Sequence, residues 1–417
     1  MIFEFDRIRV GTRLNRVASS RGVRGFREIL FLLMLTGCAE TGSDVAHLDP
    51  SELAEEVHAA LAEPIRLDGY ARLMPALQQL GPENVDAVSE VYTELFRGLG
   101  EPELRPFLDA WVAFDPAAAL AYAERQPVAL ATKQAYAAVI YSWATREPIR
   151  AREVALEIIG ESAYLTEAVT HALIRGWAMS DQDGLVKYVA SSSDDPGYMA
   201  HIAAPQIYLR SGAEGLFEWT DQLIESTAGY APRMKAFRFA VRTVGFRNPQ
   251  AAIPYINAHR GADYAKDGPR ALLEVWIEQD HETALEWLRT GAPEASRAEA
   301  LHMAFGSWLA HDPTEARSWI EAVPATDPFY QPAFSSFAKR LAKIDPIKAL
   351  EWCRRGQLDV GHRDCLLPVA TTWYRKDPVA AGRWLERESG LDVADRIGVR
   401  RRGANGVRNQ NSAAISD

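Results

Sequence analysis

Histidines, cysteines and basic residues are the side chains of this sequence whose spacing could support chemistry. The His-Glu pair at 281–282 would begin a zinc-binding helix if a histidine followed at position 285, but that residue is Leu285. The His-Arg-Asp tripeptide at 362–364 could place a base for phosphoryl transfer, but Val369 stands where an asparagine is needed. We therefore predict no catalytic residues, no metal site, no cofactor and no enzymatic activity.

The chain has three cysteines, Cys38, Cys353 and Cys365, which are too few for a disulfide scaffold or a cysteine-rich zinc module. Cys353 is expected at the end of one helix and Cys365 near the start of the next, so the two meet across a short loop. In an oxidising compartment they could form a disulfide. The alternative is a pair of buried free thiols.

A basic helix between residues 231 and 247 is the most distinctive candidate surface. Its sequence, APRMKAFRFAVRTVGFR, places Lys235, Arg238 and Arg242 on one face, with Arg233 near one end. We take these four residues as a candidate patch for binding an acidic peptide or a phosphate-bearing glycolipid. The alternative is an exposed face whose cations pair with acids on neighbouring helices.

The overall charge argues against a nucleic-acid partner. The net charge is −10, yet residues 1–37 and 396–417 each carry +4, which leaves −18 on the residues between them. A strongly acidic body repels phosphate backbones. No apolar run approaches the roughly 18 residues of a membrane-spanning helix.

A repeated phrase, seen in WLAHDPTEARSWIEAVP at 308–324, indicates the elements that position these residues. An acidic or amide residue, often followed by proline, recurs every 31 to 36 residues. Aspartate or asparagine before proline is typical of a helix start. We therefore expect each anchor to lie between two helices. Helix A precedes the anchor, and helix B begins at it. The anchors are Asp115, Glu147, Asp181, Gly212, Asn248, Asp280, Asp312, Asp345 and Asp377.

The eleven tryptophans follow the same register. Each lies four residues before an anchor, in helix A, or seven residues after one, in helix B. A fixed register predicts a shared core rather than a ligand groove. A lone hairpin of about 33 residues cannot bury enough apolar area to fold, so we expect each hairpin to form part of its neighbour's core.

The period and the Ala-then-aromatic pattern of helix B resemble tetratricopeptide-like (TPR-like) repeats. The usual Gly-Tyr pair in helix A is absent, and acid-Pro replaces the usual turn. The resemblance implies an all-α fold, a right-handed α-solenoid of about nine helical hairpins. It also implies an extended surface that binds a protein or peptide.

The segment Leu35-Thr36-Gly37-Cys38 follows basic residues and a short apolar run, and it resembles the lipobox of bacterial lipoproteins. The resemblance implies cleavage before Cys38, lipidation of its thiol and anchoring to a membrane, with Ala39 favouring the outer membrane facing the periplasm. The apolar run is short and 28 residues precede it, which a start at Val23 would explain. The alternative is a buried apolar segment.

The expected organisation is a signal peptide at 1–37, a tether at 38–48, an N-terminal helical cap at 49–110, the repeats at 111–395 and a disordered basic tail at 396–417. The expected function is that of a membrane-anchored, non-catalytic envelope scaffold that binds a protein or peptide through its groove. One alternative is a glycan-active envelope enzyme, a hydrolase or lyase, which would need two carboxyl groups with raised pKa in one pocket. Another is a structural spacer.

Overall fold

The computed structural model describes residues 48–63, 66–95, 99, 101–126, 129–192, 195–355, 359–387 and 390–413. Every regular element in these ranges is a helix and none is a strand, so the predicted all-α class is confirmed. The predicted signal peptide, the lipidation residue Cys38 and the tether up to residue 47 lie outside the described residues.

Short connections join the helices, and two single-turn 3-10 helices lie among them. In chain order the elements are α2 (Pro50–Leu61), α3 (Arg66–Leu77), α4 (Val85–Leu95), α5 (Glu101–Val112), α6 (Pro116–Glu124), α7 (Ala129–Arg146), α8 (Pro148–Glu161), α9 (Thr166–Met179), α10 (Leu185–Ser191), α11 (Pro196–Ser226), α12 (Tyr230–Arg247), α13 (Pro249–Ala258), η2 (Asp263–Ala265), α14 (Gly268–Trp276), α15 (His281–Thr290), α16 (Glu294–His311), α17 (Pro313–Ala322), η3 (Pro328–Tyr330), α18 (Gln331–Leu341), α19 (Pro346–Arg355), α20 (Asp359–Lys376), α21 (Pro378–Arg387) and α22 (Val393–Ala413).

Most anchors begin a helix B, as predicted. The side chain of Asp312, for example, accepts a hydrogen bond from the backbone N–H of Glu315 at 3.0 Å. The bond satisfies one of the N–H groups that a helix start leaves without a partner. The same bond, to the residue three positions on, forms at Asp115, Asn248, Asp280, Asp345 and Asp377.

Two anchors behave differently. Asp181 was expected to begin a helix, but α10 starts at Leu185, after Gly184 with φ 106°. At Gly212 there is no loop: α11 continues through the anchor, and the chain leaves helical geometry at that residue with φ 69° and ψ −164°. Glycine accepts these positive φ values because it has no Cβ, so glycine rather than a cap makes both junctions.

The tryptophans form core, as predicted. Nine of the eleven are buried, and Trp319 and Trp352 are half-buried. The rings mainly pair within a hairpin, however, where packing between neighbouring hairpins was expected. The residue four before an anchor meets the residue seven after it, because the two helices of one hairpin run side by side. Ring centroids lie 5.4–5.9 Å apart in Trp111–Tyr122, Trp177–Tyr188, Trp276–Trp287, Trp308–Trp319 and Trp373–Trp384.

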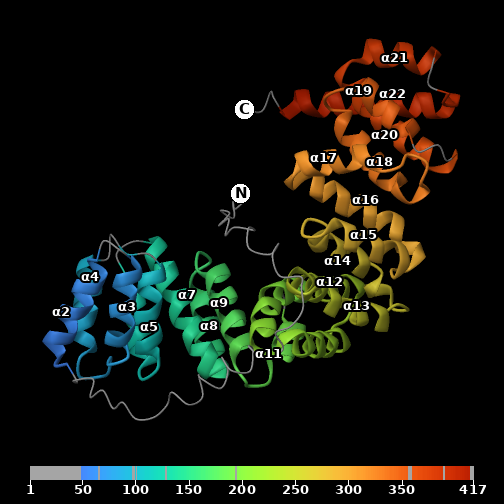
Figure 1. The fold of residues 1–417 in the computed structure, drawn as a ribbon. Coiled ribbons are helices and arrows are strands. Elements are labelled where there is room, and N and C mark those ends of the chain that lie inside the picture. Colours follow the sequence, from blue (N-terminus) through green and yellow to red (C-terminus); the bar gives the residue numbers. More distant parts are fainter. Residues whose placement is uncertain are drawn as a thin grey trace, which may run out of the picture.

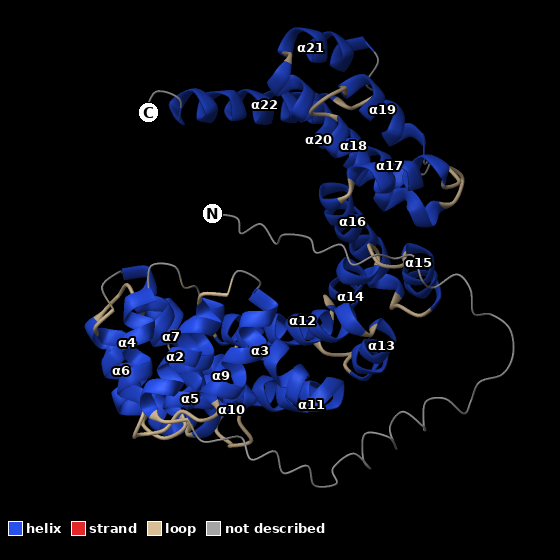
Figure 2. Cartoon of the chain, turned by 60° about the vertical axis from the view of Figure 1, so that its left-hand side comes forward, coloured by secondary structure: helices blue, strands red, loops and turns tan. Residues whose placement is uncertain are grey.

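The helices follow a curved path, shown in Figure 1. Each helix A packs against the next one, so that α12, α14, α16, α18, α20 and α22 form a continuous row. In Figure 2 this row lies on the inner side of the curve, and α13, α15, α17, α19 and α21 lie on the outer side. The same pairing of every second helix runs through α5, α7, α9 and α11.

The predicted boundaries at 110/111 and 395/396 need correction, because each falls inside a helix, α5 and α22 respectively. The N-terminal helices share one apolar core with the helices that follow. Nor is the region from 396 to 413 irregular. It continues α22, which packs on α20 through an ion pair between Arg363 and Asp395 and through the buried side chain of Val399.

A candidate groove for acidic ligands

Two hollows lie side by side along the row of helices A in the N-terminal half. The first, of about 290 Å³, lies between α5, α7 and α9, and the second, of about 580 Å³, lies between α9, α11 and α12. His171 lines both, so the hollows are neighbours along the row. We call them together the helix-A groove. Its charged and aromatic side chains are Arg105, Lys133, Tyr141, Glu167, His171, Arg175, Asp195, Tyr198, Lys235, Arg238 and Phe239.

The repeat register explains why these side chains share one surface. Arg105, His171 and Arg238 each lie ten residues before their anchor, and Tyr141 and Arg175 each lie six before theirs. Residues four apart on a helix share one face. Equivalent positions on successive helices A therefore line one continuous strip, while the tryptophan register turns toward the core.

Four cations of the groove have no acidic partner among the described residues: Arg105, Lys133, Arg175 and Arg238. They lie over aromatic rings instead. The Arg105 guanidinium is 4.3 Å and that of Arg175 is 5.8 Å from the centroid of Tyr141. Lys133 Nζ lies 5.4 Å from the ring of Tyr164, and the Arg238 guanidinium lies 5.2 Å from that of Phe239. Such contacts orient a cation without neutralising it, so the groove stays positively charged.

The candidate patch on α12 divides in two. Lys235 forms an ion pair with Asp195, and Arg242 forms one with Glu274, so both pair with acids on neighbouring helices. Arg233 Nε donates to the Thr227 carbonyl at 2.7 Å.

Lys235 and Arg238 line the groove, and Arg238 Nε is buried without a hydrogen-bond partner. Of the two residues of the candidate patch that line the groove, Arg238 is thus the one without an acidic partner among the described residues.

Sequence reasoning missed Arg105, Lys133 and Arg175 because it considered one helix at a time. The positions of these basic residues relative to the repeat anchors could have revealed the groove. Basic residues occur ten or six positions before the anchors of three different hairpins, at Arg105, Arg175 and Arg238. Aligning the helices A by anchor would have placed these three side chains on one strip.

Two histidines add a titratable component. His171 Nε2 lies 3.0 Å from the Tyr198 hydroxyl, and the ring of His201 lies 4.4 Å from that of Phe239. Burial lowers the pKa of His171, as do Arg175 and, more weakly, Lys133, against an opposing effect of Glu167. Burial likewise lowers the pKa of His201. The lowered pKa favours the neutral form of both imidazoles, and an anion bound in the groove beside His171 would favour the charged form of that residue.

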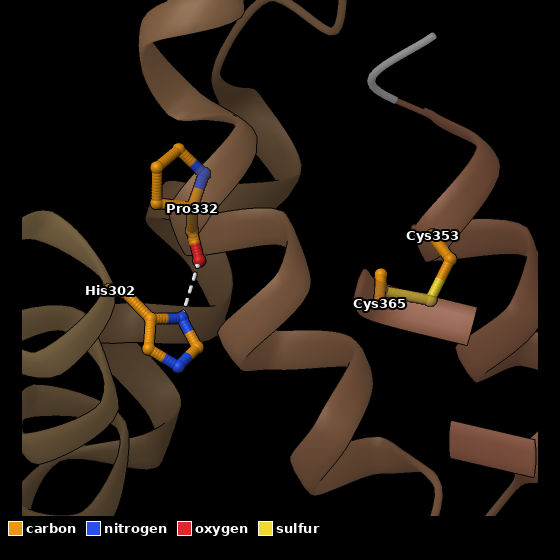
Figure 3. The surroundings of a disulfide bond; sticks show 4 residues. All are labelled: His302, Pro332, Cys353 and Cys365. Atoms are coloured by element: carbon orange, nitrogen blue, oxygen red, sulfur yellow. Dashed lines mark hydrogen bonds between the residues drawn. A yellow bond between two sulfur atoms is a disulfide. The ribbon is translucent and has the colours of Figure 1, made fainter. Parts of the chain in front are cut away.

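Cys353 and Cys365 are joined in a disulfide, with Cα atoms 5.6 Å apart (Figure 3). The bond links α19 to α20, away from the helix-A groove. Figure 3 also shows His302 Nδ1, on α16, 3.0 Å from the Pro332 carbonyl on α18. A carbonyl only accepts, so this nitrogen donates. The Ser336 hydroxyl returns a bond to the His302 carbonyl, and together the two bonds tie α16 to α18.

No carboxyl group stands out as a general acid. Each carboxyl group in the described ranges with a shifted pKa has it lowered, as at Asp195, where a hydrogen bond from Lys235 is the main cause. Nothing here favours the glycan-active alternative, which needs a raised pKa.

Within the described ranges there is no cluster of three or more histidine, cysteine or acidic side chains placed to hold a metal ion. Among the same residues, no helix combines the length and apolar character needed to cross a membrane. Comparison with known protein families, with curated proteins and with solved structures found no match to this chain.

Proposed function

We propose that this protein is a membrane-anchored scaffold of the bacterial cell envelope that binds an acidic segment of a partner protein in the helix-A groove. The observation that carries the proposal is the set of four cations, Arg105, Lys133, Arg175 and Arg238, that face one groove without acidic partners. Cations that lack partners within a body of net negative charge are most simply explained by an external anion.

The scaffold is a right-handed TPR-like α-solenoid of about nine hairpins in this proposal. Its support is the row of packed helices A, the outer row of helices B and the recurring anchor. In such a stack each unit contacts its neighbours, and the inner row offers an extended surface.

The dimensions of the groove suit an extended peptide. It crosses five helices, and helices pack roughly 8–10 Å apart, so its length is about 40 Å. An extended chain rises about 3.3 Å per residue, which gives a segment of about 12 residues. Arginine binds carboxylates through paired hydrogen bonds, and these are among the stronger polar contacts available to it.

The location is proposed from the lipobox-like sequence at 35–38, with Cys38 as the lipidated residue. The disulfide between Cys353 and Cys365 supports a compartment outside the reducing cytosol. A lipid-modified N-terminus followed by a short tether would hold the groove close to the membrane.

A binding experiment tests the groove. A 12-residue Glu-rich peptide with a fluorescent label is titrated with the protein, and anisotropy is followed at several salt concentrations. We expect salt-dependent binding, and the triple change Arg105→Ala, Arg175→Ala, Arg238→Ala should weaken it by at least about 100-fold, since a hydrogen bond to a charged group contributes roughly 1.5–3 kcal/mol.

Arg317→Ala is the matched control for that titration. Arg317 pairs with Glu321 on α17, outside the groove, so its loss should leave the affinity unchanged. Equal affinity of the wild-type protein and the triple variant for the peptide would refute the groove.

A separate experiment tests the anchor. In a bacterial host, the full chain should incorporate a labelled fatty acid and fractionate with membranes, and Cys38→Ala should abolish both. Incorporation of label into the Cys38→Ala protein would contradict the assignment of this residue.

A further inference from the structure

We infer that the second hollow of the groove is an anchor pocket for one large apolar side chain that lies next to a carboxylate in the bound segment. This inference rests on the proposed function and specifies the kind of partner sequence. The pocket is formed by α9, α11 and α12 and measures about 580 Å³, within the range of about 300–1,000 Å³ that is usual for ligand sites.

The walls of the pocket are mainly apolar. Met199 and Ile202 come from α11 and Phe239 from α12, while Ala163 lies at the start of the connection into α9. Tyr198 is 47 % exposed although its ring packs beside His171, so part of an apolar wall faces solvent. Burying that wall against an apolar side chain would remove both surfaces from water.

One cation in this pocket is free to bind an anion. Lys235 is held by Asp195, where Gly197 lets α12 approach so closely that an added Cβ would lie 2.4 Å from the Cβ of Lys235. Arg238 lies one turn further along α12, and its buried Nε has no partner. Its guanidinium group lines the pocket and forms no ion pair with an acid of the described residues, so a ligand carboxylate could bind it. The carboxylate and the apolar side chain therefore belong to neighbouring positions of one ligand.

The first hollow has a different character. Its lining consists of alanines, Tyr141, His171, Gln134 and the cations Arg105, Lys133 and Arg175. It offers three cations, and its apolar wall is built from alanines and Tyr141, without the larger aliphatic and phenylalanine side chains of the second hollow. A segment that fits both hollows carries its large apolar residue over α11 and α12 and its acidic run over α5, α7 and α9.

The test compares two 12-residue acidic peptides that differ in a single residue, Phe or Ala, next to a glutamate. With the wild-type protein, the Phe peptide should bind roughly 10- to 100-fold more tightly, the factor expected for burying one such side chain. Ala163→Trp, which fills the pocket, should reduce this ratio to about one. Ala168→Trp, which fills the first hollow instead, is the matched control and should weaken both peptides while keeping the ratio.

A second comparison tests the role of Arg238. Replacing the glutamate beside the Phe by glutamine should weaken binding to the wild-type protein and have little effect on the Arg238→Gln protein. Circular dichroism of each variant checks that the helices are intact.

The outcomes separate the two proposals. Salt-dependent binding of both peptides with equal affinity overturns the anchor pocket and leaves the acidic groove standing. A Phe preference that persists in Ala163→Trp also overturns the pocket. Failure of both peptides to bind the wild-type protein overturns the pocket together with the proposed function.

Discussion

Removal of one buried indole tests how the hairpins are held together. Trp308 on α16 is 1 % exposed, and its ring packs against Trp319 at 5.5 Å, Phe305 at 6.1 Å and His281 at 5.2 Å. A buried tryptophan hides about 150–250 Å². At about 25 cal/mol per Å² this is about 4–6 kcal/mol, and measured Trp-to-Ala changes in cores cost about 3–5 kcal/mol. We expect Trp308→Ala to destabilise α16 and α17 by about 4 kcal/mol.

Hydrogen exchange of backbone amides is the suitable assay because it reports each helix separately. If every hairpin contacts mainly its neighbours, protection should fall in α14 to α18 and persist in α2 to α9. Trp308→Phe is the matched control and should cost less. It keeps a six-membered ring and removes an indole N–H that has no hydrogen-bond partner.

Two results would refute this reasoning. A loss below about 1.5 kcal/mol in α16 and α17 would mean that the ring pair does not hold the hairpin closed. An equal loss of protection in every helix from α2 to α22 would mean that the chain unfolds as one unit rather than by local steps.

Three other predictions concern the disulfide, His171 and the C-terminal helix. Reduction should raise the intact mass by two hydrogens, and Cys353→Ser should destabilise the α19–α20 hairpin by about 3 kcal/mol, the chain-entropy value for a separation of 12 residues; an unchanged mass would remove the bond. Acidic-peptide affinity should increase as pH falls from 7 to 5.5, because an anion bound in the groove raises the lowered pKa of His171 and binding is accompanied by proton uptake. A flat pH profile, or a His171→Gln variant with the same pH profile as the wild-type protein, would contradict this. Arg363 lowers the pKa of Asp395, so the contribution of this pair is fully present above the unfolded-state pKa and is lost as pH falls through the lowered pKa of the folded state. Asp395→Asn should speed hydrogen exchange in α22 at pH 7, and unchanged exchange there would show that the pair does not hold the helix.

The repeat register was predictable because it depends on local chemistry. Aspartate before proline fixes a helix start within a few residues of the chain, and the bond from Asp312 to Glu315 shows the expected result. The burial of the tryptophans followed from their register for the same reason. The junctions at Gly184 and Gly212 were not predictable, since a positive φ replaces the cap there and leaves no acid-Pro signal.

The pairing of the groove cations could not be predicted because it depends on packing between hairpins. Lys235 pairs with Asp195, which is 40 residues away in the sequence, and Arg242 pairs with Glu274, which is 32 residues away. Arg238 lies between these two cations on α12 and pairs with no acid of the described residues. Most of α22 was expected to be disordered, because few of its residues are apolar. It is held where Asp395 meets Arg363, a contact that polar composition alone does not reveal.

The packing of aromatic rings against each other within one hairpin affects how such a chain could gain or lose repeats. Trp276 packs against Trp287, and Trp373 against Trp384, so in these units each indole has its nearest aromatic partner within the same hairpin. A duplication or deletion of one whole period therefore leaves no orphaned indole at the new junction, and it need only match the smaller residues across the seam. An insertion between the two rings of a pair, which lie 11 residues apart in the sequence, would instead separate the rings and expose both.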